Sequence, residues 1–494
     1  MKNDPTKFLS EAVLPGEGYE HFIHGLPQAP ANGLYIDVED PSTGAAYTRC
    51  ARGTAQDIEL AVQSAQAGFE AWSRMQPVER ARVLRRISDL VLADVDRLSR
   101  LESIDTGKPL TVSRADVTTC ARYFEYFSGV ADKMCGEVIP ASNEHLMYLV
   151  HEPFGVTGHI IPWNAPISMT GRGIAPALCA GNSVVVKPAE ETPVTTLELA
   201  KLCIRAGLPA GAFNVVTGFG IEAGKALVEN ERVRKISFTG SVETGREVLV
   251  AAGKRIIPAT VELGGKSPFI IFDDADLKRA ATLARKAFVF NTGQICSAGT
   301  RLLVHEKVID AFTELLIEDL RCVTVGQAIN DPDIGPVISR RQLDRVNSYI
   351  ELGTQEGAEL VYPQSALTGA IQGGAGHFVQ PTLFKGVTNS MRIAREEIFG
   401  PVGVLIPFKD EHEAVSIAND SEYGLAAAVW TSDGARGLRM AGRLQAGQVY
   451  INDYQPIGVE APFGGYKNSG FGREKGLAAL HDYTQVKTVI ARTI

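Results

Sequence analysis

Apolar residues in the first third of the chain recur at helical spacing. The segment Thr54–Asp57 combines an N-cap residue with an acid at the third helical position, and an amphipathic run continues from it to Trp72. A second helix is predicted from Pro77, where apolar residues follow at mostly three-to-four spacing: Val83, Ile87, Val91 and Leu98. The pattern predicts mainly helical structure for residues 1–130.

Short apolar runs replace the helical spacing after residue 145. Residues 146–161 are predicted to form paired strands, and from 180 to 265 strands alternate with helices. The predicted helices are Thr195–Ala206 and one from Ser241, and the predicted strands are Ser183–Lys187, Phe213–Val216, Lys235–Phe238 and Ala259–Glu262. Such alternation predicts a parallel sheet with helices on both faces, an architecture that binds nucleotides at the carboxyl ends of its strands.

A second alternating series extends from Pro268 to Val459 and predicts another α/β domain. The tail Val486–Ile494 alternates weakly and is predicted to be an edge strand, although its own domain offers no obvious partner for it. The chain therefore contains two predicted parallel-sheet units and one terminal strand.

Composition excludes several classes of function. The 494 residues are 45% hydrophobic, and 49 Lys and Arg against 57 Asp and Glu give a net charge of −8 without a basic cluster, which argues against a nucleic-acid partner. No apolar run is long enough to span a bilayer, and Met1–Pro5 does not open a signal peptide. The seven cysteines are scattered and include no CxxC pair, so neither a disulfide framework nor a metal site is expected. A cytoplasmic protein without a membrane partner is the expectation.

Two of the four stretches that carry candidate chemistry follow predicted strands. Ile161–Pro166 (IPWNAP) holds an amide between two prolines, which suits a rigid hydrogen-bond donor or, alternatively, a stiff turn whose Asn164 caps the next helix. Phe238–Gly245 (FTGSVETG) places Gly and Ser at a strand-to-helix turn, where backbone N–H groups favour a phosphate. Neither this turn nor Gly218–Gly220 matches the dinucleotide fingerprint G-x-G-x-x-G.

The other two stretches hold a carboxylate and a thiol. Glu262 ends a predicted strand beside two glycines that allow close approach of a ligand or a moving side chain, although such an acid is usually only solvated. Cys296 lies in a polar, Gly-flanked loop, unlike Cys179 and Cys203 in their apolar settings. Most lone cysteines are buried small hydrophobes, but this loop makes Cys296 a candidate nucleophile, with no His nearby in sequence as its base.

In this order the four stretches resemble the motifs of the aldehyde dehydrogenase superfamily, over essentially the whole chain. Two later segments match the same family: Glu396–Pro401 (EEIFGP) and Pro462–Gly470 (PFGGYKNSG). The resemblance implies an α/β fold with a Rossmann-type, parallel-sheet NAD-binding domain (1–134 and 154–264), a second α/β catalytic domain (265–480) and a small β oligomerisation arm (135–153 and 481–494). It also implies a homodimer or homotetramer, in which the tail extends a neighbour's sheet.

The resemblance implies roles for three catalytic residues. Cys296 would attack the aldehyde, and the oxyanion would be held by the Asn164 amide and the Cys296 backbone N–H. After hydride transfer to NAD, Glu262 would activate the water that hydrolyses the thioester. A carboxylate can also serve the thiol directly or through water, which removes the need for a His. The presence of all three residues favours a hydrolytic enzyme over a relative that acylates coenzyme A or is catalytically silent.

The resemblance also implies cofactor contacts. Lys187 and Glu190 resemble the adenosine-ribose pair, and Glu190 would repel a 2′-phosphate, so NAD is favoured over NADP; a surface ion pair is the alternative. Ser241 would contact the pyrophosphate, Glu397 the nicotinamide ribose, and Phe399 the nicotinamide ring. The other expected cofactor residues are Ile161, Pro162, Trp163, Ala189, Gly220, Phe238, Gly240 and Leu263.

The substrate aldehyde is predicted from Arg172, eight residues past Asn164 on the helix that lines the family's aldehyde tunnel. With the small Ala165, it resembles enzymes for hydroxylated aromatic aldehydes. An Arg could equally bind the carboxylate of a semialdehyde, or be a solvated or ion-paired helix residue. A broad aliphatic specificity is a further alternative. The expected substrate contacts are Met169, Arg172, Ile295 and Phe463.

Overall fold

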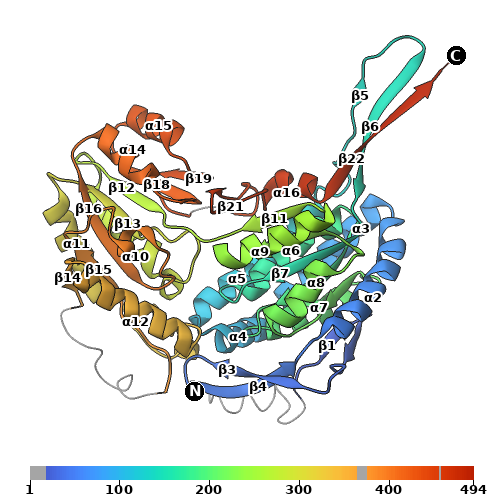
Figure 1. Ribbon diagram of the computed structural model, residues 1–494, viewed down its shortest axis with the longest axis horizontal. Coiled ribbons are helices and arrows are strands. Elements are labelled where there is room, and N and C mark those ends of the chain that lie inside the picture. Colours follow the sequence, from blue (N-terminus) through green and yellow to red (C-terminus); the bar gives the residue numbers. More distant parts are fainter. Residues whose placement is uncertain (1–17, 364–374, 456–457, 494) are drawn as a thin grey trace.

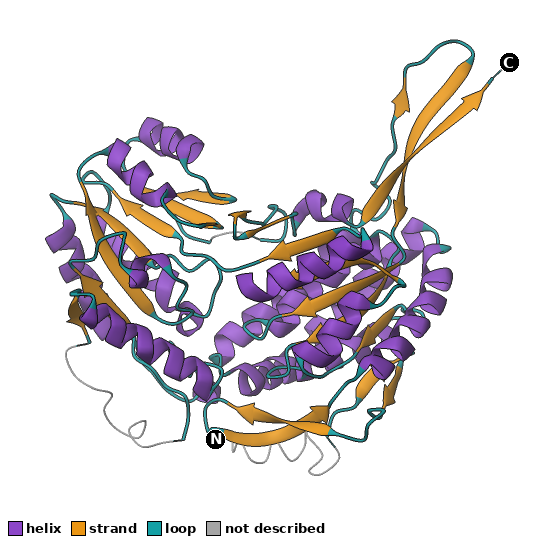
Figure 2. Ribbon diagram, viewed as in Figure 1, coloured by secondary structure: helices purple, strands orange, loops and turns teal. Residues whose placement is uncertain are grey.

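Two open parallel sheets, each with helices packed against it, lie side by side, and a three-stranded sheet projects away from them (Figures 1 and 2). The computed structural model describes residues 18–363, 375–455 and 458–493; the segment Met1–Pro5 lies outside this range. Within these residues, no helix combines the length and apolar character needed to cross a membrane.

The helices predicted in the first third are present, but strands precede them. Thr54 accepts a hydrogen bond from the N–H of Gln56, and Asp57 caps the Thr54 N–H in return, so the predicted capping box is confirmed. The helices are α2 (Ala55–Ser73), α3 (Pro77–Ala93), α4 (Val95–Thr106) and α5 (Leu110–Ser128). The strands are β1 (His21–Ile23), β2 (Leu26–Gln28), β3 (Tyr35–Asp40) and β4 (Ala45–Ala51). The prediction of a mainly helical start is therefore wrong before residue 55, because β3 pairs with β4 and β1 with a distant strand.

The first large sheet has the order β2-β1-β9-β8-β7-β10-β11-β21. Its five central strands are parallel: β7 (Val156–Ile161), β8 (Ser183–Pro188), β9 (Phe213–Val215), β10 (Val233–Thr239) and β11 (Ala259–Glu262). The connecting helices are α6 (Pro166–Cys179), α7 (Val194–Arg205), α8 (Lys225–Glu229, after the π-turn Gly220–Gly224) and α9 (Val242–Arg255). The strands predicted between 180 and 265 are confirmed, since continuous apolar runs are typical of strands buried on both faces.

The second large sheet has the order β14-β15-β16-β13-β12-β18-β19. Its strands are β12 (Pro268–Ile271), β13 (Arg301–His305), β14 (Glu359–Tyr362), β15 (Thr382–Lys385), β16 (Val402–Phe408), β18 (Ala426–Trp430) and β19 (Gln448–Ile451). Its helices are α10 (Leu277–Val289), α11 (Ile309–Arg321), α12 (Arg340–Gln355), α13 (Arg392–Arg395), α14 (Glu411–Asn419) and α15 (Gly434–Arg443). Short strands β17 (Tyr423–Gly424), β20 (Tyr466–Lys467) and β21 (Gly470–Phe471) lead from this unit back to the first sheet.

The projecting sheet consists of β5 (Val138–Ile139), β6 (His145–Pro153) and β22 (Thr484–Arg492), which follows α16 (Gly476–Asp482). All nine residues of β22 pair antiparallel with β6, so the C-terminal tail has a partner strand within its own chain. Residues 146–161 form two strands, as predicted, but the expectation that these strands pair with each other is wrong. Gly155, at φ 117°, turns the chain between β6 and β7, and the two strands enter different sheets.

Candidate functional site

The candidate site lies where the chain order of the first sheet reverses. From β7 the chain proceeds to β8 and β9 on one side, and it returns to β10 and β11 on the other side. In open parallel sheets, ligands bind at the carboxyl ends of the strands beside such a reversal. The predicted cofactor residues gather at this edge. They are Ile161, Pro162 and Trp163 after β7; Lys187, Ala189 and Glu190 at the end of β8; Phe238, Gly240 and Ser241 at the end of β10; and Leu263 after β11.

A cavity of about 550 Å³ opens between α8 and α9 beside the end of β10. Gly220 and Phe238 contribute to its wall, and next to it Ser241 caps α9 by accepting a hydrogen bond from the N–H of Thr244 at 3.2 Å. The other backbone N–H groups of this first helical turn can bind an anion such as a pyrophosphate. This part of the site therefore suits an adenosine and its adjoining phosphates.

A charged cluster lies at the end of β8. The Lys187 ammonium is 2.8 Å from the Glu190 carboxylate, and Lys187 is only 3% exposed, so this is not a surface ion pair. The next acid, Glu191, faces Arg341 of α12 at 3.6 Å, which links the first unit to the second. Glu190 remains partly exposed and can accept hydrogen bonds from a ribose.

Glu397 and Phe399 lie at the end of the site opposite the part that suits an adenosine. The N–H of Gly265 donates to the Glu397 carboxylate at 3.0 Å, and burial raises the pKa of Glu397 to about 7. A side chain at Gly264 would collide with the same carboxylate, which explains the glycine pair after Glu262. Phe399 adopts φ 60°, and its ring meets that of Trp163 edge to face at 5.1 Å.

Two residues that support this end escaped the sequence analysis. Gln342 donates from its side chain to the carbonyl of Phe399 at 2.8 Å, and Arg345 donates to the carbonyl of Glu397 at 2.5 Å. Both belong to α12, and together they hold the loop that carries Glu397 and Phe399. Polar residues on an amphipathic helix usually face solvent, so their spacing offered no signal of this role.

The loop of Cys296 is bound to the IPWNAP segment by amide hydrogen bonds. The Asn164 side chain donates to the carbonyl of Gln294 at 3.0 Å, and the Asn291 side chain donates to the carbonyl of Asn164 at 3.1 Å. Asn164 does not cap α6, whose N-cap is Ala165 without a side-chain bond. The capping alternative is therefore wrong, and the second N–H of the Asn164 amide remains available to a ligand beside the loop.

Burial favours the neutral forms of Cys296 and Glu262. It raises the pKa of the Cys296 thiol to about 12, and the nearby Arg172 charge only partly offsets this shift. Burial, reinforced by the charge of Glu474, also raises the pKa of Glu262 well above its usual range. Neither carboxyl oxygen of Glu262 has a hydrogen-bond partner among the described residues. Once it has ionised, a buried carboxylate without hydrogen-bond partners is a strong base that can accept a proton from the thiol or from water.

Gly464 of the PFGGYK segment makes room for this carboxyl, and Gly265 after β11 makes room for the Cys296 loop. A Cβ at Gly464 would lie 2.8 Å from one Glu262 oxygen, and one at Gly265 would collide with the carbonyl of Cys296. Both positions therefore exclude larger residues at the point where the two units meet.

Arg172 is part of a buried ion pair. It lies on α6 and is only 5% exposed, its guanidinium forms an ion pair with Glu474, and it stacks 4.4 Å from the ring centre of Phe463. A sulfur contact of 3.7 Å joins it to Met169. Arg172 is thus ion-paired in the structure, and its contact with a substrate stays a prediction. The partner, Glu474, lies about 300 residues further along the chain, so the spacing of residues around Arg172 could not have predicted this pair.

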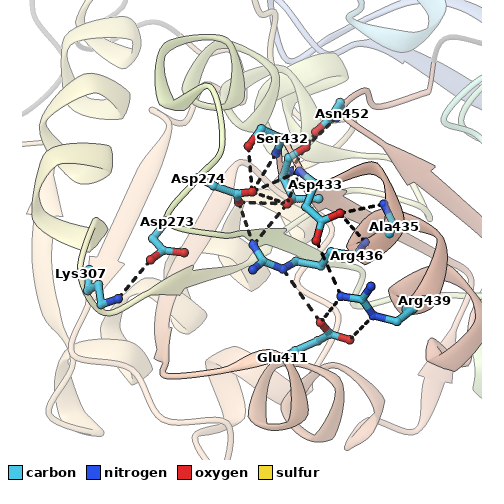
Figure 3. Close-up of polar contacts among 11 residues, drawn as sticks. Asp273, Asp274, Lys307, Glu411, Ser432, Asp433, Ala435, Arg436, Arg439 and Asn452 are labelled. Carbon is cyan, nitrogen blue, oxygen red and sulfur yellow. Dashed lines mark hydrogen bonds and ion pairs between the residues drawn. The ribbon is translucent and has the colours of Figure 1, made fainter.

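The corresponding edge of the second sheet is filled by the protein itself (Figure 3). Its chain order reverses between β12 and β18, and Asp274 follows β12 at that point. The Asp274 carboxylate accepts from the Ser432 and Asp433 N–H groups, both at 3.2 Å, directly before α15. The Thr431 hydroxyl and Arg436 also donate to it, each at 2.9 Å. A protein carboxylate thus occupies the place that corresponds to the predicted pyrophosphate position in the first sheet.

Comparisons with known proteins agree with this geometry. The aldehyde dehydrogenase family pattern matches residues 29–489. Hydroxyisobutyraldehyde dehydrogenase of Mycolicibacterium austroafricanum is 44% identical over 469 residues, which are 95% of this chain and 92% of that protein. Betaine aldehyde dehydrogenase of Cereibacter sphaeroides is 45% identical over 472 residues, 95% of this chain and 96% of that protein. The NAD+ complex of an aldehyde dehydrogenase from Bacillus cereus superposes with a TM-score of 0.95 at 40% identity, covering 100% of this chain and 99% of that one. These matches confirm the predicted α/β fold class.

Proposed function

The chain belongs to the aldehyde dehydrogenase family and is an NAD-dependent enzyme, and from this premise we propose that it oxidises an aromatic or carboxylate-bearing aldehyde to the carboxylic acid by a hydrolytic route. The observation that carries the proposal is the hydrogen bond from the Asn164 amide to the Gln294 carbonyl in the Cys296 loop. Beside this loop is the buried Glu262, whose carboxyl has no hydrogen-bond partner among the described residues. Asn164, Cys296 and Glu262 are the donor, the nucleophile and the base that the reaction requires.

The proposed reaction begins with loss of the Cys296 proton to Glu262, directly or through water. The thiolate then forms a carbon–sulfur bond to the aldehyde carbon, and the Asn164 amide and the Cys296 N–H donate to the new oxyanion. Bound NAD+ would supply the hydride acceptor for oxidation to the thioester. Glu262 releases the thiol proton to solvent and then accepts a proton from the water that attacks the thioester. As the acid leaves, Glu262 returns this proton to the Cys296 thiolate, which restores the thiol.

Reduction of NAD+ by added aldehyde, with coenzyme A omitted, tests this proposal directly. A hydrolytic dehydrogenase produces NADH continuously, an acylating relative stops after about one turnover, and a silent relative produces none. A panel of aromatic, carboxylated and aliphatic aldehydes then separates the proposed substrate class from the semialdehyde and broad aliphatic alternatives.

Glu190 is proposed to enforce the preference for NAD over NADP. We expect Glu190→Gln to raise kcat/KM with NADP about 10- to 100-fold, because it removes a negative charge that would face the 2′-phosphate. The change with NAD should be smaller, since an amide oxygen still accepts from the ribose. Steady-state kinetics with both coenzymes measure the ratio, with the exposed Glu231→Gln as a control. An unchanged NADP/NAD ratio in Glu190→Gln would contradict the assignment.

The projecting sheet is proposed as the oligomerisation arm of a homodimer or homotetramer. It extends away from both large sheets (Figure 1) and exposes Val138, Leu146, Val486 and Ile490. Exposed apolar side chains on a sheet with a free edge favour addition to another sheet. We retain the proposed division into an NAD-binding domain (1–134 and 154–264), a catalytic domain (265–480) and this arm (135–153 and 481–494).

Deletion of Thr484–Ile494 should shift the protein toward monomers, because it removes β22 and leaves the edge of β6 that faced β22 without a partner, while β6 still pairs with β5. Sedimentation velocity at micromolar concentration measures the change, and the single substitution Val486→Lys tests the apolar face without removing the strand. A full-length protein that sediments as a monomer would contradict the assembly.

A further inference from the structure

The phenyl ring of Phe463 lies between two cations at the proposed aldehyde site. The Arg172 guanidinium is 4.4 Å from the ring centre, and the Lys475 ammonium is 5.3 Å from it. Arg172 and Lys475 each interact electrostatically with both Cys296 and Glu262, so the two positive charges act on the same reactive groups. Two positive side chains therefore lie against the Phe463 ring, close to the Cys296 thiol.

The two cations differ in how their charge is balanced. Arg172 is paired with Glu474, whereas the Lys475 side chain has no ion pair or hydrogen bond within the described part of the chain. The nearby Glu262 does not compensate it, since burial favours the neutral form of that carboxyl. Lys475 is half-buried, and burial together with Arg172 lowers its pKa to about 8, so it remains mostly protonated at neutral pH. The charges of Glu474 and Glu460 act on this ammonium only at longer range. The site thus holds one cation without a direct ion-pair or hydrogen-bond partner among the described residues.

The backbone at Lys475 is unusual for a residue with a side chain. Its φ of 63° and ψ of 166° belong to a region populated almost only by glycine. Glu474, the residue before Lys475, exchanges two backbone hydrogen bonds with Phe463. The Phe463 N–H donates to the Glu474 carbonyl at 2.6 Å, and the Glu474 N–H donates to the Phe463 carbonyl at 2.8 Å. This pairing places the backbone of Lys475 next to Phe463, and the Lys475 ammonium lies 5.3 Å from the centre of the Phe463 ring.

We propose that Lys475 binds the carboxylate of the substrate, so that the enzyme prefers aldehydes that carry a negative charge over neutral aldehydes of the same shape. The inference rests on the proposed function and names the residue that selects among its substrates. A carboxylate next to this half-buried ammonium gains a charge-assisted hydrogen bond with little competition from water. The same charge disfavours a cationic substrate such as betaine aldehyde.

Two aromatic aldehydes that differ by one charge test the proposal. We expect wild-type kcat/KM for 4-carboxybenzaldehyde to exceed that for 4-formylbenzamide about 10- to 100-fold. Lys475→Met should bring the ratio close to one, mainly by raising KM for the carboxylate, because an effect of the lost charge on Cys296 or Glu262 changes both aldehydes alike and cancels in the ratio. Lys475→Arg should retain most of the preference because it retains the charge.

Controls separate failure of this proposal from failure of the proposed function. Lys254→Met, an exposed lysine in the last turn of α9, should leave both aldehydes unaffected. Thermal melting of each variant, together with its activity on the amide, shows that the site remains folded. A wild type that oxidises both aldehydes equally well, or a Lys475→Met variant that loses both equally, overturns the role of Lys475. Absence of NADH formation with every aldehyde would instead overturn the proposed function.

Discussion

Replacement of Cys296 by alanine is expected to lower kcat/KM for aldehyde oxidation by at least about 10⁴-fold, while NAD+ binding persists. The expected loss is this large because the thiol alone can form the covalent bond to the aldehyde carbon. The six other cysteines cannot replace it: Cys50, Cys120, Cys179 and Cys203 are buried in the first unit, and Cys135 and Cys322 are exposed elsewhere. The backbone N–H of residue 296 and the Asn164 amide remain in the variant, so coenzyme binding should be unaffected.

Steady-state kinetics and calorimetric titration with NAD+ measure the two halves of this prediction. Cys322→Ala is the matched control, since it removes an exposed thiol of the same unit after α11. Turnover above about one per cent of wild type in Cys296→Ala would remove Cys296 from the mechanism.

Replacement of Glu262 by glutamine is expected to lower steady-state kcat about 10²- to 10⁴-fold, because general base catalysis contributes factors of this size. If water activation is the impaired step, NADH appears in a burst of about one per active site and the acyl group stays on Cys296. Slow acylation is also compatible, since the same carboxyl can accept the thiol proton. Rapid-mixing fluorescence and intact-mass measurement distinguish the two cases.

The pH profile of this variant provides an independent check. A base acts only when deprotonated, and burial raises the pKa of Glu262 well above its usual range. Wild-type kcat should therefore increase with pH until this carboxyl has ionised, and Glu262→Gln should lose that increase. Wild-type turnover by Glu262→Gln, or an unchanged pH profile, would exclude the proposed base.

The sequence predicted those parts of the fold and site that depend on local pattern. The apolar run at Ser183–Lys187 allowed β8 to be placed almost to the residue, since a strand buried on both faces has few polar positions. The strands before residue 55 were missed because their stability comes from pairing with distant strands rather than from a local pattern.

The same distinction holds for the site. Asn164, Glu262 and Cys296 could be predicted because each lies in a short, distinctive segment. The ion pair of Arg172 with Glu474 was one of several alternatives for Arg172, and the sequence could not name the partner because Glu474 comes from another part of the chain. Lys475 was overlooked because it adjoins no motif used in the prediction, and only the three-dimensional contact with Phe463 indicates its role.

The Asp274 carboxylate at the head of α15 has a consequence for how tightly each half of the molecule is held together. The Asp274 carboxylate is part of the chain and cannot leave its site, so the second sheet keeps its anion at any concentration of coenzyme. The first sheet depends for its anion on a coenzyme that leaves after every turnover. Amide hydrogens around the ends of β7 and β10 should therefore exchange faster whenever the coenzyme is scarce, while those around β12 and β18 keep a constant protection.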